Sequence, residues 1–192
     1  MFREQFKPAI LIFLILTVVT GIVYPLFVTG IAQVFFHDQA NGSLIYRNNR
    51  PVGSTLIGQE FNDPKYFWGR ISATSPVPFN AAASSGSNFG PSNPALIDAV
   101  KARIKALKDL DQDNTNSIPV DLVTSSASGL DPHISLAAAY YQVPRVARSR
   151  GLSQDVVKNI VKQHTAGRLL GVIGEPVVNV LETNLALDEY KK

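Results

Sequence analysis

A chain of 192 residues without a single cysteine can form no disulfide, thiolate nucleophile or cysteine-ligated zinc site. Its 18 basic and 15 acidic residues leave a formal charge of only +3, too small an excess for the footprint of a nucleic-acid-binding protein. Hydrophobic residues make up 45% of the chain, and the longest run of them lies near the N-terminus.

This apolar run extends from Ala9 to Phe36. No charged residue occurs in it, and 16 of the 20 residues from Ala9 to Val28 are aliphatic or aromatic. A helix of 20 residues spans about 30 Å, the thickness of bilayer hydrocarbon. A cleaved signal peptide has a shorter apolar core and a small-residue cleavage site, which Val28-Thr29-Gly30 matches poorly. The pattern predicts one retained transmembrane helix over residues 9–36.

The charges that flank this helix predict its orientation. Arg3 and Lys7 precede it closely, whereas no basic residue follows it until Arg47. Positively charged flanks stay on the cytoplasmic side of a membrane. We therefore expect residues 1–8 to form a short cytoplasmic N-terminus and residues 37–192 to form an extracytoplasmic domain.

Small or helix-distorting residues recur every four positions along the predicted span, at Thr17, Gly21, Pro25 and Thr29. Such strips let a second transmembrane helix approach closely, which makes Thr17, Gly21 and Pro25 candidate partner contacts. The alternative is that glycine and proline are simply common in spanning helices.

Residues 37–192 have the usual size of one domain, and their 16 basic and 14 acidic residues give a net charge of +2. Short β-prone runs at residues 43–46 and 55–57 are separated by turn residues, among them Asn48-Asn49, Arg50-Pro51 and Gly53. We expect two brief strands here.

Three aromatic residues and an arginine follow in the segment Tyr66-Phe67-Trp68-Gly69-Arg70. One interpretation is a core anchor with the arginine reaching to solvent. The other is a docking surface formed by Tyr66, Trp68 and Arg70, since these residue types dominate interface hot spots.

The rest of the chain predicts a small mixed α+β domain whose helices lie mostly in the C-terminal half. Residues 72–94 are rich in proline, serine and glycine and should form a loop. The first half of residues 118–132 is a candidate strand, and residues 125–129 form a second loop. Capping residues and apolar spacing predict helices over 94–110, from Ser135 to Arg150 with a kink or restart at Pro144, over 153–164, and from Pro176 to Leu187.

Motifs for catalysis are largely missing from the sequence. No Gly-x-x-x-x-Gly-Lys-Ser/Thr phosphate loop, His-Glu-x-x-His pair or Gly-x-Ser-x-Gly elbow occurs, and His37, His133 and His164 are far apart. We expect neither a catalytic residue nor a bound metal.

Two weaker constellations remain. Asp121, Asp131 and His133 lie near the serine-rich loop at residues 125–128 and have the residue types of a hydrolytic set, although Asp131-Pro132 is also typical of a turn leading to a helix cap. The second is a basic patch on neighbouring helices that is typical of solvated helix faces but has the charge to bind a phosphate or an acidic partner: Arg145, Arg148, Arg150, Lys158 and Lys162.

Nearly the whole chain resembles the C subunit of the bacterial Kdp potassium-transporting ATPase, the KdpC family. The matching stretches are Gly21 to Leu26, Ala40 to Ile45, Gly53-Ser54, Leu56 to Gln59 with Phe61, Tyr66-Phe67, Gly69-Arg70, Ser84 to Asn88, Ser92 to Pro94, Asp121 to Thr124, Ser126 to Ile134, Arg145 to Ala147, and Gly174 to Pro176 through Asn184 to Asp188. Ile71, Ser125 and Leu136 depart from the family pattern.

The resemblance implies a non-catalytic accessory subunit of a high-affinity, ATP-driven potassium uptake pump in the bacterial cell membrane. Its implied partners are a potassium-channel-like subunit, a P-type ATPase subunit and a very small membrane subunit. The Asp-Lys-Thr-Gly phosphorylation motif of the ATPase subunit is absent from this chain. Potassium is the transported ion, and no cofactor is expected to bind this chain directly.

The family is described as a catalytic chaperone that raises the ATPase subunit's affinity for ATP. The resemblance assigns a nucleotide-binding signature to the loop Thr124 to Leu130, with Ser126, Ser128 and Gly129 as its candidates. The predicted orientation places this loop across the membrane from cytoplasmic ATP, so an affinity effect would be transmitted as coupling between states of the complex.

Two alternatives stay open at this point. One is a membrane-anchored extracytoplasmic hydrolase that uses the region from Ser125 to His133. The other is an inward-facing regulator of the pump that binds ATP through residues 124–130 and the patch at Arg145.

Overall fold

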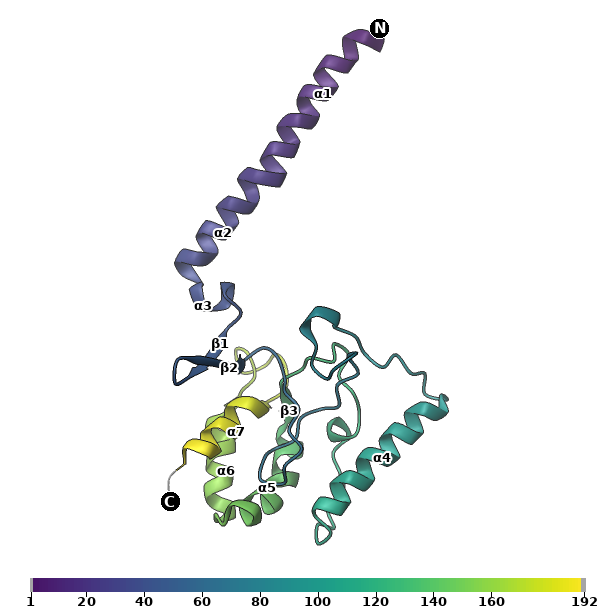
Figure 1. Cartoon of the computed structure of the whole chain (residues 1–192), viewed down its shortest axis with the longest axis vertical. Helices are drawn as coiled ribbons and strands as arrows, with labels where there is room; N and C mark the ends of the chain where they lie inside the picture. The colour runs from purple at the N-terminus through teal and green to yellow at the C-terminus, as the bar shows by residue number, and fades with distance from the viewer. Residues whose placement is uncertain (1, 191–192) are drawn as a thin grey trace. The chain divides into compact units, whose positions relative to one another are not determined.

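The computed structural model describes residues 2–190, and the chain divides into two compact units on either side of the Leu44–Ile45 bond (Figure 1). The first unit is a long apolar helix. The second is a small domain that mixes helices with short strands, as the sequence predicts.

The N-terminal helix is continuous but not uniform. Helix α1 (Phe2–Val18) leads into a π-helical turn, η1 (Val19–Val23), and helix α2 (Tyr24–Phe35) follows without a break. Residues 4–35 are long and apolar enough to span a membrane, and none of their side chains is buried within the chain. The predicted helix is confirmed, while its crossing of a membrane stays a prediction.

A one-turn helix, α3 (His37–Ala40), ends the first unit, and a two-stranded hairpin starts the second. The hairpin joins β1 (Leu44–Arg47) to β2 (Arg50–Ser54) through Asn48 and Asn49, which both have positive φ angles of 50° and 59°. Asparagine tolerates this conformation, which two-residue hairpin turns require.

The predicted second strand at residues 55–57 is wrong. Strand β2 occupies the preceding residues instead, and Thr55 and Leu56 form a turn. The Ser54 Oγ accepts the Leu56 N–H at 3.1 Å and the Ser54 carbonyl accepts the Ile57 N–H at 3.4 Å. A serine that satisfies these two donors locally favours a tight turn over an extended strand.

Helix α4 (Pro94–Leu110) confirms the predicted helix with its asparagine cap, because the Asn93 Oδ1 accepts the Ala95 N–H at 2.9 Å. The loop before it is irregular as expected, apart from a short 3₁₀ turn, η2 (Ala81–Ala83). The candidate strand in the first half of residues 118–132 is wrong, because Val120–Leu122 forms a 3₁₀ turn, η3.

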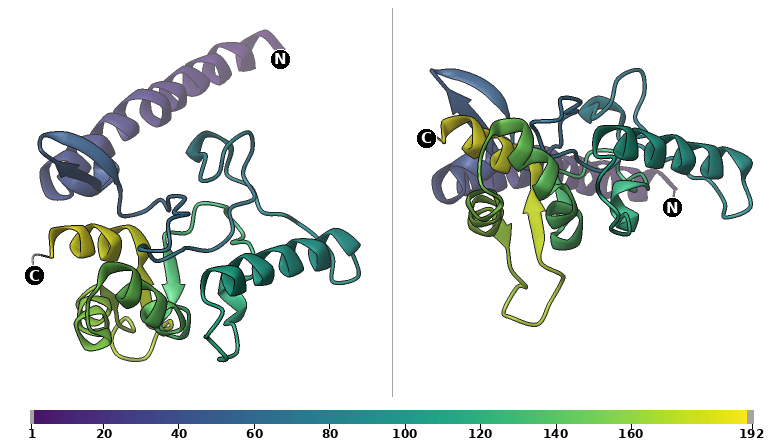
Figure 2. Two further views of the ribbon diagram at one scale, coloured as in Figure 1. Left: turned by 60° about the horizontal axis from the view of Figure 1, so that its bottom comes forward. Right: turned by 90° about the horizontal axis from the view of Figure 1, so that it is seen from below.

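The C-terminal half packs three helices against a three-stranded antiparallel sheet in the order β3-β5-β4 (Figure 2). Its strands are β3 (His133–Ser135), β4 (Thr165–Ala166) and β5 (Val177–Asn179), and its helices are α5 (Leu136–Arg150), α6 (Gln154–Gln163) and α7 (Val180–Glu189). Pro144 lies inside α5 without interrupting it. The last helix starts later than predicted, because residues 177–179 first pair with β3 and Asn179 then caps α7.

The core lies between the sheet, α5, α6 and the extended segment at residues 66–70. Its fully buried apolar side chains include Phe67, Leu122, Ile134, Val143, Val146, Val157, Val161, Val178 and Leu187. Helix α4 contributes its C-terminal end, where Leu107 is buried, while Ile97 near its start is about half exposed.

Candidate functional site

The predicted partner strip on the N-terminal helix coincides with the π turn. Gly21 lies inside η1, and a Cβ placed on it would meet no atom within 4 Å. Pro25 has no N–H, so the Gly21 carbonyl loses its α-helical partner, a situation in which helices adopt a wider turn. The Tyr24 N–H accordingly reaches back five residues to the Val19 carbonyl.

The π turn keeps the strip straight. In an α-helix, a residue four positions further along is rotated by about 40° beyond a full turn around the axis. In the wider π turn, four residues fall short of a full turn, so the two rotations partly cancel. Thr17, Gly21 and Pro25 therefore stay closer to one line than in an uninterrupted α-helix. The Thr17 hydroxyl donates to the Phe13 carbonyl at 2.7 Å, which leaves no unsatisfied polar hydrogen on the strip at this position.

The aromatic segment is a core anchor. Phe67 is 1% and Trp68 is 7% exposed. The Phe67 N–H donates to Asn184 Oδ1 at 2.8 Å, and Asn184 Nδ2 donates to the Phe67 carbonyl at 2.9 Å. Gln142 holds Trp68 in the same manner, at 2.8 and 3.0 Å. Two buried amide side chains thus supply the hydrogen bonds that neighbouring strands would give to the backbone of this segment in a sheet.

Two arginine side chains lie close to the ring of Trp68. The guanidinium of Arg103 is 4.7 Å from the centroid of the indole ring, and that of Arg145 is 5.7 Å from it. Both guanidiniums donate to backbone carbonyls of the same segment, including those of Gly69 and Tyr66. The ring therefore packs within its own domain, and Trp68 has little surface left to contact a partner.

Arg145 is not a surface cation. Arg145 is only 3% exposed, and its guanidinium donates to Gln142 Oε1 at 2.7 Å and to the Pro64 carbonyl. Burial lowers the pKa of this guanidinium to about 10. Arg148 pairs with the buried Asp111, and Arg150 donates to the Lys65 carbonyl at 2.7 Å. The predicted basic patch is wrong as a single surface, because its arginines hold the fold together.

Tyr66 and Arg70 are half-buried and engaged at the edges of this core. The Tyr66 hydroxyl donates to Asp188 Oδ2 at 3.0 Å, and the Arg150 guanidinium lies 5.0 Å from the centre of its ring. Arg70 pairs with Asp131 at 3.3 Å and donates to the Ser125 carbonyl at 3.0 Å. Both side chains keep some exposed surface, so their contact with a partner stays a prediction.

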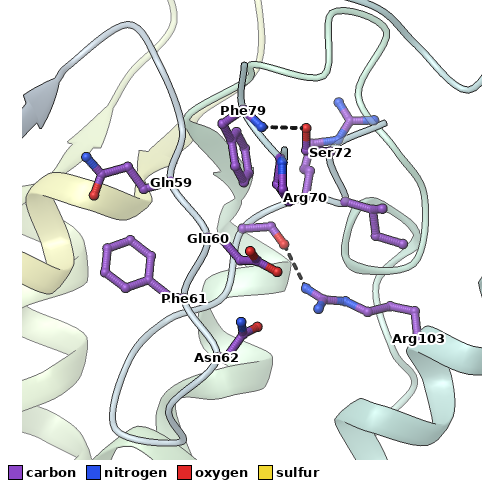
Figure 3. Close-up of a pocket in the computed structure, with 11 residues that line it drawn as sticks. Gln59, Glu60, Phe61, Asn62, Arg70, Ser72, Phe79 and Arg103 are labelled. Carbon is purple, nitrogen blue, oxygen red and sulfur yellow. Dashed lines mark hydrogen bonds between the residues drawn. The ribbon is translucent and has the colours of Figure 1, made fainter. Parts of the chain in front are cut away.

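A cavity of about 120 Å³ lies beside Arg70 and is shown in Figure 3. Charges of both signs line it, from Arg70, Arg103 and Glu60, and the Arg103 guanidinium donates to the Gly69 carbonyl at its edge. Sites for drug-sized ligands measure about 300–1,000 Å³. This cavity is too small for a nucleotide.

The serine–glycine loop at residues 126–129 is locked by its own hydrogen bonds. The Ser126 N–H donates to the Ile71 carbonyl at 3.2 Å, the Ser128 carbonyl accepts the Ser85 N–H at 3.0 Å, and the Ser128 Oγ accepts the Leu130 N–H at 3.1 Å. Ser126 is itself buried. These hydrogen bonds hold the loop's conformation, and Ser126 and Ser128 also line an open depression beside Arg70.

Gly129 explains why this loop needs glycine. Its φ angle is +69°, and a Cβ at this position would lie 2.5 Å from the Ser85 carbonyl oxygen and 2.6 Å from a Thr74 methyl carbon. The Gly129 carbonyl accepts the Ser72 hydroxyl at 2.7 Å. Glycine is required here by backbone conformation and close packing, which is a structural reason that needs no nucleotide. The family-derived assignment of Ser126, Ser128 and Gly129 to nucleotide binding stays a prediction.

The hydrolytic set is not assembled. Asp121 accepts the Ser135 N–H at 2.7 Å and the Ser135 hydroxyl at 3.2 Å, so it supports the cap of α5. His133 lies 3.6 Å from Asp131, but within residues 2–190 no serine hydroxyl is hydrogen-bonded to its ring. Such catalysis needs a nucleophile that is hydrogen-bonded to a base, and a base that is in turn hydrogen-bonded to an orienting acid.

Asp131 combines a turn with an ion pair. Its Oδ1 accepts the His133 N–H at 3.0 Å, which makes the predicted turn before the Ser135 cap. Burial by itself would raise the pKa of this carboxyl, but the hydrogen bonds from His133 and the charge of Arg70 outweigh burial and hold the pKa below its usual value. Across residues 4–190, no three histidine, aspartate or glutamate side chains converge as a metal site.

The comparisons with known proteins match the chain over almost its full length. A family model described as "K+-transporting ATPase, c chain" matches residues 6–189. A protein of Ralstonia nicotianae is 64% identical over 185 residues, which cover 96% of this chain and 91% of that protein. A protein of Dechloromonas aromatica is 63% identical over 190 residues, covering 99% and 100% of the two chains. Both carry the name "Potassium-transporting ATPase KdpC subunit".

Proposed function

Because the chain belongs to the KdpC family of K⁺-transporting ATPase c chains, we propose that it is the non-catalytic accessory subunit of an ATP-driven potassium uptake pump. The observation that carries this proposal is the match of the family model over residues 6–189, together with relatives at 62–64% identity that the chain covers over 91–100% of their length. A match of this extent includes both the apolar helix and the domain, so it applies to the whole subunit.

The geometry supports a role in assembly. The helix over residues 4–35 buries none of its apolar surface within the chain, so bilayer lipid and neighbouring helices would cover it. In this proposal Thr17, Gly21 and Pro25 face a helix of the channel-like or the ATPase subunit. The domain lies outside the cytoplasm of a bacterial cell, on the side from which potassium enters, and stabilises the complex or controls access to it.

Any effect of this subunit on ATP affinity would be indirect. Backbone groups of the serine–glycine loop and the Ser128 hydroxyl are engaged within the domain, and Arg145 is buried. A coupling free energy between two states of the complex would carry such an effect, and it needs no contact with nucleotide.

One observation favours the second candidate, direct nucleotide contact by an inward-facing domain. An open depression of about 490 Å³ is lined by Arg70, Ser126 and Ser128 among others, and its volume is sufficient for a nucleotide. Arg70, however, already pairs with Asp131 at 3.3 Å. A phosphate would have to replace this carboxylate.

The experiment that tests the proposed function compares pump complexes with and without this chain. The chain is produced in full length together with the other subunits of the potassium pump, and potassium-stimulated ATP hydrolysis is measured in the isolated membranes. We expect hydrolysis to depend on the presence of the chain, whereas the purified chain alone hydrolyses no ATP. Hydrolysis by the chain alone, or full pump activity without it, would overturn the proposal.

A further inference from the structure

The connection between β4 and β5 is an ordered hairpin whose tip is apolar and unprotected. We name residues 168–175 the apolar hairpin. Its side chains are the most exposed aliphatic group of the domain: Leu169 at 66%, Leu170 at 84%, Val172 at 75% and Ile173 at 57%. Folded domains expose single aliphatic side chains commonly, but four at one tip mark an interaction site.

The hairpin projects from the domain as an arm. The right-hand view of Figure 2 shows it extending beyond the sheet, with no other segment of the domain beside its tip. A Cβ placed on Gly167, Gly171 or Gly174 would meet no atom within 4 Å. Within residues 45–190, no other segment therefore covers the four aliphatic side chains.

The tip is nevertheless rigidly defined by its backbone. The Leu169 N–H donates to the Ile173 carbonyl at 2.8 Å, and the Ile173 N–H donates back to the Leu169 carbonyl at 3.0 Å. Leu170 and Gly171 turn the chain with positive φ angles of 53° and 77°. An arm that is ordered before binding loses little conformational entropy when it docks.

Leu170 is the residue whose identity the backbone does not explain. A left-handed φ angle is unfavourable for a residue with a Cβ, and glycine or asparagine normally occupies such positions. A leucine that is 84% exposed also gains nothing from burial within its own domain. Both local factors oppose leucine here, so its side chain points to a contact outside the chain.

The charges at the base of the arm favour a protein over a lipid surface. One terminal nitrogen of Arg168 lies 3.0 Å from both carboxylate oxygens of Glu175, so the base is neutral. Segments that enter a bilayer surface carry unpaired lysine or arginine and interfacial tryptophan or tyrosine. Residues 167–175 contain no aromatic residue and no unpaired cation. An apolar tip with a neutral polar rim has the composition of a protein interface instead.

We propose that the apolar hairpin docks into an uncharged, apolar pocket on another protein subunit of the pump, with Leu170 and Val172 as its principal contacts. This inference rests on the proposed function, because it assumes that the chain assembles with the other subunits. It goes beyond that function by assigning the contact to one arm of the domain.

The test uses the accessibility of a single cysteine, since the chain has none of its own. Val172→Cys and Val77→Cys are compared because both valines are well exposed, at 75% and 56%, and Val77 lies in the loop at residues 72–94, away from the hairpin in the sequence. The full-length variants are placed in membrane fragments that are open on both sides, either alone or assembled with the other subunits, and their modification by a polar maleimide is timed.

We expect assembly to protect Val172→Cys and to leave the modification rate of Val77→Cys unchanged. If Val172→Cys is protected equally in the chain alone, the tip lies in the bilayer or against a second copy of the chain, and the proposal is overturned. If it remains reactive in the assembled complex, no pocket receives the tip. Recovery of the unmodified chain with the other subunits is measured in parallel. If this recovery fails, the proposed function fails with it, whereas a normal recovery with a reactive tip refutes the docking arm alone.

A second variant measures the energy of the contact without weakening the fold. Leu170→Asn removes the apolar side chain but places a residue at the turn that favours the left-handed conformation. We expect the apparent affinity for the complex to fall by at least about thirtyfold, the effect of losing a hot-spot residue, with the fluorescence of Trp68 unchanged. An affinity within about twofold of the wild type would contradict the proposal.

Discussion

Gln142 and Asn184 show at the scale of single residues how this domain is held together. Each amide side chain is buried and satisfies both the N–H and the carbonyl of one residue in an extended segment, Trp68 and Phe67 respectively. Buried backbone groups must find partners, and here no neighbouring strand supplies them. The polar core is therefore necessary for the segment that carries the aromatic anchor.

Replacement of Gln142 by leucine tests this role. Gln142→Leu leaves the N–H and carbonyl of Trp68 unpaired in the core, and each such group costs about 1–3 kcal/mol. We expect the free energy of unfolding to fall by about 3 kcal/mol, measured with denaturant on the full chain in detergent. The fluorescence of Trp68, the chain's single tryptophan, reports the transition. The exposed Gln112→Leu is the matched control, and an equal loss in both variants would refute the account.

Asp131 predicts how stability depends on pH. Its pKa in the folded protein lies below the usual value, so its ionised form stabilises the fold above the pKa of the unfolded chain. This contribution is lost as the pH falls below about 4 and the carboxyl takes up a proton. We expect Asp131→Asn, which keeps an acceptor for the His133 N–H, to make the free energy of unfolding less dependent on pH in this range. An unchanged pH dependence would show that other carboxylates dominate.

At the scale of elements, local signals predicted the helices and missed the sheet. Asn93, Ser135 and Ser153 each accept an N–H of the first helical turn, as their positions in the sequence indicate, and Gly151 ends α5 in the left-handed conformation. Caps involve residues only two or three positions apart, so the sequence displays them. The predicted helix starts were accurate wherever such a cap was recognised.

The three strands of the sheet have two or three residues each, and the pairing of β3 with β5 joins residues more than 40 positions apart. Pro176 resembled a helix start because proline favours the first turn of a helix. Residues 177–179 instead pair with the edge of β3, and the helix begins after them. The burial of Arg145 was unpredictable for the same reason, since the carbonyls it binds lie about 80 residues earlier in the chain.

The anchor helix provides a prediction of its own. Gly21→Leu adds a large side chain in the π turn, in the middle of the strip formed by Thr17, Gly21 and Pro25. Leucine is fully compatible with lipid, so insertion into the membrane should be unchanged. We expect recovery of the chain with its partner subunits to fall more than about fivefold, as for the loss of 1 kcal/mol at a helix interface.

Gly30→Leu is the control for this prediction. Gly30 lies one residue, about 100° of helix rotation, away from Thr29 on the strip, and a Cβ there would also meet no atom of the chain. An equal effect of the two substitutions would show that the strip is not a specific contact.

At the scale of the whole molecule, the two units have separate tasks. The N-terminal helix supplies apolar surface that the chain itself leaves uncovered, and the domain supplies a rigid core with an exposed arm. In the described part of the chain, Asp121 and Asp131 support the cap and turn before α5, and the serine–glycine loop is held by hydrogen bonds within the domain. The central claim is therefore that the domain acts from outside the cytoplasm, through contacts with protein partners.

The position of the domain relative to the membrane tests this claim most directly. Ala82→Cys and Ala127→Cys introduce single thiols at exposed sites, the second within the serine–glycine loop. Intact cells are treated with a membrane-impermeant maleimide, and the labelled chain is quantified before and after the membrane is opened. The account predicts that both thiols are labelled in intact cells, which places the loop across the membrane from cytoplasmic ATP. Labelling only after the membrane is opened would contradict it and would make direct nucleotide contact the better explanation.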